Sequence, residues 1–492
     1  MKSILLSKSK YMSGLQCSKY LWLLFHDPSK VSQPDASTQH VFDEGHRIGE
    51  LAWQLFPNGV PIPTDDFRGN LTQTKDLLKK RQPLFEPAVF IEGIYSRLDI
   101  LNTVGSDEWD IVEVKGSTKV KDENINDVSF QRLCAQKAGL KIRKCFLVHI
   151  NNQYVRSGEI ESQKFFATED ISAEVDTASA GIEDRIKAMF DVISATDCPD
   201  MLIGGHCGEP YPCPVTSCWD NLPEHHIFEL YRGGKKCSDL YSQGVLTIKD
   251  IPDGFKLSAS QTIQKECIAT GDAHIEKEAI AQFINSLTYP VYYFDFETIN
   301  PAIPLYDGTR PFQRIPFQFS LHVVATPSST PEHYSFLADG ADDPRPKLLA
   351  EMKRLFGDKG SIVVYNQSFE RSVMQELREN FPEYKDWLDG LCSRLVDLYE
   401  PFRNFQYYNL DQHGSASIKE VLPAVTGKSY KGMEIAHGDD ASLAFFALTS
   451  GTLNTEERKT IQSNLEKYCG LDTEGMIWIV NQLKNIGGTT KL

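Results

Sequence analysis

The sequence has 492 residues, 41% hydrophobic and 24% charged, which is typical of globular proteins and excludes a disordered or fibrous chain. At about 100–200 residues per domain, this length predicts two to four domains. Acidic residues outnumber basic residues by 67 to 51, and the net charge of −16 excludes a protein that coats nucleic acid by bulk positive charge. An enzyme that acts on nucleic acid stays possible, because metal-dependent nuclease sites are built from carboxylates.

The compartment is predicted from what the sequence lacks. No apolar run approaches the roughly 20 residues needed to span a bilayer, and residues 1–8 do not resemble a signal peptide. The eleven cysteines are an odd number in a chain with no export signal, which argues against a disulfide scaffold. We therefore expect a cytoplasmic protein with no membrane partner.

Residues 1–222 are predicted to form an α/β domain, because helical and strand-like patterns follow one another along them. A helix is expected over 41–56, with one apolar face formed by Val41, Ile48, Leu51, Ala52 and Leu55. The other expected elements are helices over most of the first forty residues, at 128–137 and at 175–195, and strands within 88–102, 109–115 and 144–150.

Three charged residues in this domain form the first candidate site. Asp99 ends one predicted strand, and Glu113 and Lys115 lie on the next. Because side chains alternate along a strand, Glu113 and Lys115 should share a face, and a hairpin partner can bring Asp99 beside them. Two carboxylates can hold Mg²⁺, and a lysine can orient water and offset phosphate charge. This arrangement predicts metal-assisted hydrolysis of a phosphodiester.

These residues resemble the PD-(D/E)XK nuclease superfamily, and the glycine-containing strand before Asp99 is most similar to its RecB-type branch. The resemblance implies a restriction-endonuclease-like fold, with Asp99 and Glu113 as ligands of Mg²⁺ or Mn²⁺ and Lys115 as a catalytic residue. Gln131 matches the glutamine that this branch carries on a later helix.

The match departs from the family at two points. The tyrosine expected four residues after the glutamine is Ala135, and the upstream helical residue that completes such sites has two candidates, His46 and Glu50. The simpler alternative is that Glu-x-Lys is an exposed ion pair on a strand, since such tripeptides are common.

A group of cysteines follows this domain core. Cys198, Cys207, Cys213 and Cys218 fall within 21 residues, without the Cys-x₂-Cys spacing typical of structural zinc. Three cysteines after a nuclease core and one far upstream, Cys17, resemble the iron–sulfur nucleases of the RecB branch, which include CRISPR-associated and helicase–nuclease members. The resemblance implies a structural [4Fe–4S] cluster held by Cys17, Cys207, Cys213 and Cys218. Zinc or free thiols are the alternatives, and Cys198 is the rival ligand.

Residues 223–287 are mostly polar with a helical pattern, which predicts a helical connector. At Tyr289 the pattern changes to a buried strand, and strands and helices alternate over 288–492, which predicts a second α/β domain. Its further elements are expected at 317–324, 361–365, 369–380, 417–421 and 455–483.

The second domain carries its own acidic residues. Asp295 and Glu297 share one face of a buried strand, Glu370 follows a strand, and Tyr468 and Asp472 share one face of a late helix. Acidic residues from three segments can build a two-metal site, in which one ion activates water and the other stabilises the leaving oxygen.

In order, these segments resemble the motifs of DEDD exonucleases on the ribonuclease-H-like fold. The resemblance implies metal ligation by Asp295, Glu297, Glu370 and Asp472, with Tyr468 orienting the attacking water. Glu370 is a departure, because the family usually has Asp there. The simpler alternative is that these acids only cap the ends of strands.

Lys419 and the loop 414–417 are further candidates for phosphate contact. The whole chain resembles uncharacterised bacterial proteins that join the two modules in this order. The resemblance implies a two-site nuclease whose partner is nucleic acid, with DNA favoured over RNA, and whose C-terminal site is a 3′→5′ exonuclease. The alternatives are a binding or assembly factor with inactive sites, and a zinc-stabilised enzyme that acts on RNA.

Overall fold

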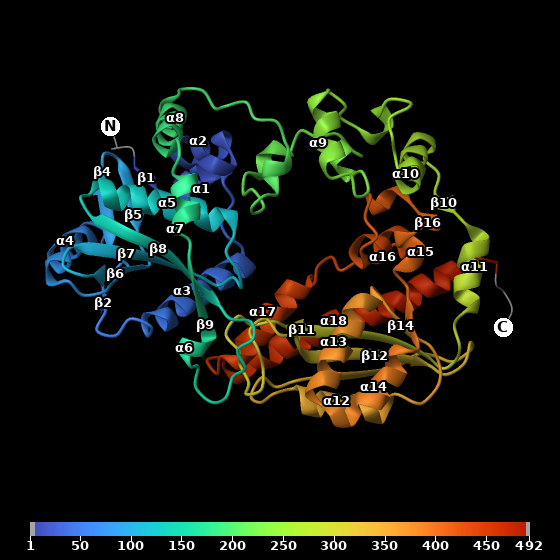
Figure 1. Ribbon diagram of the computed structural model, residues 1–492. Coiled ribbons are helices and arrows are strands. Elements are labelled where there is room, and N and C mark those ends of the chain that lie inside the picture. The colour runs from blue at the N-terminus through green and yellow to red at the C-terminus, as the bar shows by residue number, and fades with distance from the viewer. Residues whose placement is uncertain (1–4, 489–492) are drawn as a thin grey trace. The chain divides into compact units, whose positions relative to one another are not determined.

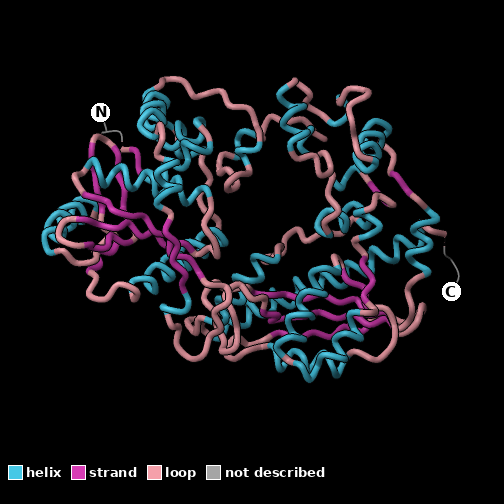
Figure 2. The backbone as a smooth tube through the Cα atoms, viewed as in Figure 1, coloured by secondary structure: helices cyan, strands magenta, loops and turns pink. Residues whose placement is uncertain are grey.

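The computed structural model describes residues 5–488, which form mixed α/β units with several sheets (Figure 1). The chain divides into two compact units. The first unit consists of two segments, the chain up to Asn221 and the later segment Ala302–Phe312. The second unit comprises Leu222–Pro301 and the residues from Gln313 onward. In each unit the strands are flanked by helices (Figure 2). No helix within the described range is long and apolar enough to cross a membrane.

The first unit contains a six-stranded sheet, of order β2-β3-β6-β7-β8-β9, and a three-stranded sheet, of order β1-β5-β4. Its strands are β1 (Leu6–Ser7), β2 (Val60–Pro61), β3 (Leu84–Phe85), β4 (Ala88–Ile91), β5 (Ile94–Arg97), β6 (Ile100–Val104), β7 (Glu108–Lys115), β8 (Lys141–Ile150) and β9 (Phe166–Asp170). Its helices are α1 (Lys8–Gln16), α2 (Ser18–His26), α3 (Ala36–Trp53), α4 (Phe67–Leu77), α5 (Asp122–Lys137), α6 (Ser162–Phe165), α7 (Ser172–Ala178) and α8 (Ile182–Ser194).

The central strand β7 is buried on both faces. It pairs antiparallel with β6 and parallel with β8, and its alternate residues belong to two hydrophobic clusters. Ile111 packs in one cluster and Val112 in the other, so Glu113 points to the same side as Ile111. The sequence pattern therefore places a carboxylate inside the unit.

Two helix predictions for this unit need correction. The helix expected over 175–195 is two helices, α7 and α8, because the chain turns at Gly181 with a φ of +68°. The apolar face expected on α3 is only partly buried. Ile48 and Ala52 are buried, whereas Val41 is 61% exposed.

The second unit is built on a five-stranded sheet of order β13-β12-β11-β14-β15, and β10 and β16 form a separate two-stranded sheet. Its strands are β10 (His274–Ile275), β11 (Val291–Ile299), β12 (Ile315–Val324), β13 (Glu332–Leu337), β14 (Ile362–Val364), β15 (Leu395–Asp397) and β16 (Tyr407–Tyr408). Its helices are α9 (Lys235–Ser242), α10 (Ala259–Thr270), α11 (Lys277–Asn285), α12 (Arg345–Leu355), α13 (Gln367–Asn380), α14 (Lys385–Cys392), α15 (Glu400–Arg403), α16 (Ile418–Thr426), α17 (Gly438–Thr449) and α18 (Thr455–Ile486).

The two faces of β11 have different partners. Phe294 and Phe296 pack into a hydrophobic cluster with residues of α12, α13 and α14. The alternate residues, including Asp295 and Glu297, face the long helix α18, which packs against β11 and β12 (Figure 1).

Residues 223–287 form part of the second unit. They contain the short 3-10 helix η5 (Ile227–Glu229), three α-helices, α9 to α11, and a small core in which Ile227, Leu240 and Ile248 are fully buried. The helical content agrees with the prediction, and the segment has a small core of its own.

Candidate functional sites

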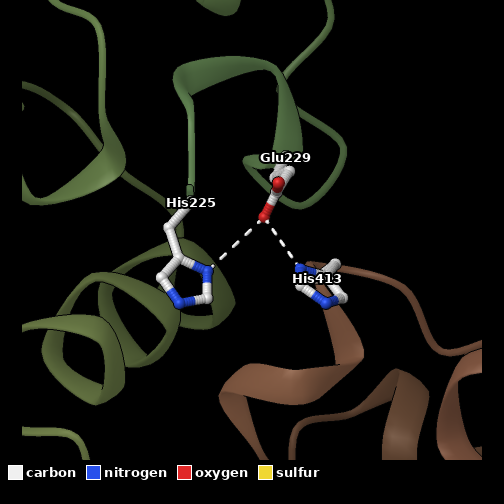
Figure 3. Close-up of side chains that lie close together, drawn as sticks. All are labelled: His225, Glu229 and His413. Carbon is white, nitrogen blue, oxygen red and sulfur yellow. Dashed lines mark hydrogen bonds and ion pairs between the residues drawn. The ribbon is translucent and has the colours of Figure 1, made fainter. Parts of the chain in front are cut away.

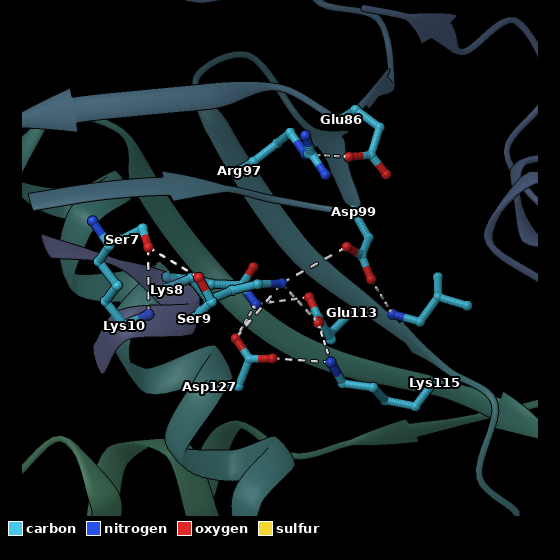
Figure 4. Close-up of polar contacts among 12 residues, drawn as sticks. Ser7, Lys8, Ser9, Lys10, Glu86, Arg97, Asp99, Glu113, Lys115 and Asp127 are labelled. Atoms are coloured by element: carbon cyan, nitrogen blue, oxygen red, sulfur yellow. Dashed lines mark hydrogen bonds and ion pairs between the residues drawn. The ribbon is translucent and has the colours of Figure 1, made fainter. Parts of the chain in front are cut away.

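The first candidate site lies on β7 and the elements around it (Figure 4). Lys115 Nζ donates a hydrogen bond of 2.6 Å to Glu113 Oε1, so the predicted shared face of the strand is confirmed. Asp99 lies in the break between β5 and β6, and its Oδ2 accepts a 2.9 Å hydrogen bond from the backbone N–H of Val114. The three predicted residues therefore come together.

Helix α5 adds Gln131, as predicted. Its Nε2 donates to Glu113 Oε2 at 2.7 Å and to Asp127 Oδ1 at 2.9 Å, and Gln131 and Glu113 are both fully buried. Ala135, one turn later, is buried in the hydrophobic core. His46 and Glu50 are exposed on α3, and no contact between them and this group is found among residues 5–488.

Two residues that sequence reasoning missed complete this cluster. Lys8, at the start of α1, places Nζ 3.1 Å from Glu113 Oε1, 3.7 Å from Asp127 Oδ1 and 3.9 Å from Asp99 Oδ1. Although burial alone lowers the pKa of a lysine, the surrounding carboxylates hold the pKa of Lys8 above its ordinary value. Asp127 could have been found from its i,i+4 spacing to Gln131 on one helix face.

Glu86 lies beside this cluster and was also missed. Its carboxylate pairs with Arg97 at 2.6 Å, and its backbone N–H donates to the carbonyl oxygen of Asp99. Burial, reinforced by the charge of Asp99, raises the pKa of Glu86 to about 7. A carboxyl group with this pKa can exchange protons near neutral pH.

Four predicted cysteine ligands line one small cavity: Cys17, Cys207, Cys213 and Cys218. Cys17 lies between α1 and α2, and the neighbouring Gln16 side chain donates to the carbonyl oxygens of His206 and Tyr211. This contact ties the upstream cysteine to the loop that carries the other three. The rival ligand, Cys198, is exposed and does not line the cavity.

The second candidate site lies between β11 and α18. Asp295 and Glu297 point from β11 toward α18, which supplies Tyr468, Cys469 and Asp472. Cys469 was not predicted, although it is three residues from Asp472 and so shares its helix face. Its Sγ lies 3.8 Å from Asp295 Oδ2, and ligand atoms of Asp295, Glu297 and Cys469 lie within 4.8 Å of one another.

Lys419, on α16, is the cation of this site. Its Nζ donates to the Tyr468 hydroxyl at 3.0 Å, lies 3.7 Å from Asp472 Oδ1, and stands 3.5 Å from the ring centroid of Tyr430. The Tyr430 hydroxyl donates to Asp472 Oδ1 and was missed by the sequence. Lys419 therefore contacts the carboxylate and the phenol that were predicted to act in catalysis.

Glu370 stands in the first turn of α13 and is fully buried. Its carboxylate oxygens make no hydrogen bond of standard geometry within the described part of the chain, although the backbone of Phe296 and the carboxyl group of Asp295 lie close to it. Burial, together with the charge of Asp295, raises the pKa of Glu370 well above its ordinary value. A fully buried carboxylate beside another acid is costly unless a proton or a cation neutralises it.

The pKa values of the other three acids, Asp295, Glu297 and Asp472, are raised as well. Burial raises the pKa of Asp295, with the charge of Asp472 adding to it, and burial also raises the pKa of Glu297. Burial raises the pKa of Asp472 too, although Lys419 opposes the shift. The site thus holds more buried negative charge than one lysine offsets.

Comparison with known proteins gives a family without an assigned activity. Residues 292–417 match the family described as "Domain of unknown function (DUF2779)", which includes Asp295, Glu297 and Glu370. The chain is 29% identical over 208 residues to "Uncharacterized protein MG366 homolog" of Mycoplasma pneumoniae, covering 38% of this chain and 31% of that protein. It is 28% identical over 215 residues to "Uncharacterized protein MG366" of Mycoplasma genitalium, covering 40% and 32%.

The match thus covers less than a third of the length of these curated relatives. These findings support the expected resemblance to a bacterial family of unknown function, and they carry no nuclease assignment.

Proposed function

We propose that this protein is a cytoplasmic, metal-dependent nuclease that acts on DNA in preference to RNA. Its C-terminal unit would have a ribonuclease-H-like fold and be a 3′→5′ exonuclease of the DEDD type. Its N-terminal unit would have a PD-(D/E)XK fold and a second hydrolytic site. The observation that carries the proposal is the gathering of buried acids in the C-terminal unit: Asp295, Glu297 and Asp472 lie near the Lys419 ammonium group, and Glu370 lies beside Asp295.

The donor set of the C-terminal site fits Mg²⁺ or Mn²⁺, because hard divalent cations prefer carboxylate oxygens. Asp295, Glu297, Glu370 and Asp472 would hold the ions, and all four carboxyl groups are buried or nearly so. When bound, such ions activate water and stabilise the leaving oxygen of a phosphodiester. The four acids would fix where the ions, and so the attacking water and the leaving oxygen, lie.

Two further residues have roles in this proposal. The Tyr468 hydroxyl would orient the attacking water, and Lys419 holds that hydroxyl in place through its 3.0 Å hydrogen bond. The Lys419 ammonium group would also attract the phosphate, since burial lowers its pKa but the acids keep a cation favourable there.

The N-terminal site is less suited to a metal ion, because lysine side chains already contact one of its carboxylates. Asp99 and Glu113 are suitable ligands, and Lys115 can act beside them. However, Lys8 and Lys115 both contact Glu113 Oε1, so a metal ion at this oxygen must compete with two ammonium groups. This contact favours a second candidate for the N-terminal unit, which is nucleic-acid binding without hydrolysis.

In this proposal the cysteine cavity holds a structural [4Fe–4S] cluster. Cys17, Cys207, Cys213 and Cys218 line the cavity together, and four thiolates are the normal ligand set for such a cluster. Zinc, which also binds four thiolates, is the alternative.

The test is digestion of 5′-labelled single- and double-stranded DNA and RNA with Mg²⁺ or Mn²⁺. We expect a ladder of shortened DNA strands, lost in Asp295→Asn and retained in Glu370→Asp, which restores the acid usual in DEDD exonucleases. Both substitutions are made in a Lys115→Ala background, which silences the proposed N-terminal site, and Lys115→Ala alone is the control. Absence of any digestion, or a ladder that persists in Asp295→Asn, would refute the exonuclease proposal.

A further inference from the structure

A third cluster of ligand-type side chains lies in the second unit, among residues to which the proposed nuclease sites give no role. His225, Glu229 and His413 point toward one another, with the Glu229 carboxylate between the two imidazole rings (Figure 3). Glu229 Oε2 lies 3.5 Å from His225 Nδ1 and 3.3 Å from His413 Nδ1. The three residues come from segments almost 190 positions apart, so the fold, and not local sequence, brings them together.

These distances match the edges of a tetrahedral metal site. Zinc binds imidazole nitrogen and carboxylate oxygen at about 2.0–2.1 Å, which separates neighbouring ligand atoms by about 3.3–3.4 Å. A hydrogen bond accounts for the contact between Glu229 and His413, but not for the contact between Glu229 and His225. Within the described residues, the Nδ1 of His225 is buried without a hydrogen-bond partner, although it faces Glu229.

The backbone around the cluster is firmly held. The carbonyl oxygen of Glu229 accepts a 2.8 Å hydrogen bond from Gln264, which is fully buried. Gly414, next to His413, has a φ of +73°, and a Cβ there would lie 1.9 Å from the same carbonyl oxygen. The backbone N–H of Gly414 donates to the Tyr408 hydroxyl at 3.2 Å. Close backbone contact thus fixes the spacing of the ligands.

Both histidines also have the left-handed backbone conformation that non-glycine residues seldom adopt, with φ of +52° at His225 and +48° at His413. Other charged groups lie nearby. His226 Nε2 is 3.5 Å from Glu229 Oε1, and Glu224 is 4.0 Å from His225 Nε2. A carboxylate beside the distal nitrogen of a metal-bound histidine increases its basicity and orients its ring.

We propose that His225 Nδ1, His413 Nδ1 and Glu229 Oε2 bind a divalent transition metal, with Zn²⁺ the favoured ion. Imidazole and a single carboxylate suit zinc better than Mg²⁺ or Ca²⁺, which prefer oxygen ligands. His413 is about half exposed, so water completes the fourth position. The ion would pin η5 to the loop 413–417 that leads into α16, the helix that carries Lys419.

The experiment measures zinc binding to the full-length protein after chelator treatment, by equilibrium dialysis and elemental analysis. We expect His413→Ala and Glu229→Gln each to bind one equivalent less than the unsubstituted protein. His274→Ala is the matched control, because His274 also pairs with a carboxylate, Glu276, at 3.5 Å, while no second histidine pairs with Glu276 among residues 5–488. Circular dichroism checks that each variant is folded.

Co²⁺ substitution separates this site from the cysteine cavity. The difference spectrum between the unsubstituted protein and His413→Ala should show tetrahedral d–d bands without a thiolate charge-transfer band. Equal zinc stoichiometry in all four proteins, or a difference spectrum with a thiolate band, would overturn the proposal. Loss of DNA digestion plays no part in this test, so failure of the nuclease proposal leaves it intact.

Discussion

Cation binding should stabilise the C-terminal unit by an amount that grows with pH. A cation at about one hundred times its Kd stabilises the folded state by about 2.7 kcal/mol. For a unit of this size, about 2–4 °C per kcal/mol gives a rise in Tm of about 5–11 °C. The perturbation is addition of Mn²⁺ to chelator-treated protein, measured by differential scanning calorimetry at pH 6 and pH 8.

The pH dependence follows from the raised pKa values of Asp295, Glu297, Glu370 and Asp472. A carboxyl group whose pKa is higher in the folded protein contributes stability below its unfolded pKa of about 4, and that contribution is lost as pH rises through the folded pKa. The cation-free protein should therefore be less stable at pH 8 than at pH 6. Because Mn²⁺ competes with protons for these groups, the rise in Tm should be larger at pH 8.

Two variants isolate the site responsible. Asp295→Asn should lose most of the rise in Tm, and without cation at pH 8 it should be at least as stable as the unsubstituted protein, because one buried negative charge is gone. Glu113→Gln, at the N-terminal site, should keep the pH-dependent rise. A rise that is equal at both pH values, or that survives in Asp295→Asn, would refute this electrostatic reasoning.

Three further predictions concern single side chains. Lys8→Met should lower the Tm of chelator-treated protein and make the N-terminal unit respond to Mg²⁺, because it removes a cation from Glu113; a Tm unaffected by the substitution contradicts this. Cys213→Ala should abolish the brown colour of anaerobically purified protein, and stoichiometric zinc in place of iron would disprove the cluster. Tyr468→Phe should slow strand shortening in the ladder assay while the Mn²⁺-induced rise in Tm persists, whereas loss of that rise would make the phenol a ligand.

The sequence predicted the parts of each site that depend on a local period. Alternation along a strand placed Glu113 with Lys115, and it separated Asp295 and Glu297 from the phenylalanines that pack into the core. Helical spacing likewise placed Tyr468 and Asp472 on one face of α18. To predict which side chains share a face, it is enough to know whether the segment is a strand or a helix, and runs of buried apolar residues indicate this clearly.

Contacts between distant segments could not be predicted in this way. Lys8 lies 105 positions from Glu113, and its place in the first site depends on how α1 packs against α5. His225 and His413 are brought together by a hydrogen bond from Gln264 to the backbone of Glu229 and a close approach at Gly414, neither of which leaves a repeating pattern. The polar composition of residues 223–287 likewise concealed a small core.

The two acidic sites balance their buried charge differently, and this difference bears on which site depends on an added cation. In the first site, Lys8 and Lys115 lie against the carboxylates of Asp99, Glu113 and Asp127, so most of the negative charge is compensated within the chain. Among the described residues, the C-terminal site has four acids and the ammonium group of Lys419 near them. Removing carboxylates from water without counter-charge is strongly unfavourable, so protons or divalent cations must make up the deficit there. The C-terminal site is therefore the one whose fold and activity should depend together on bound metal.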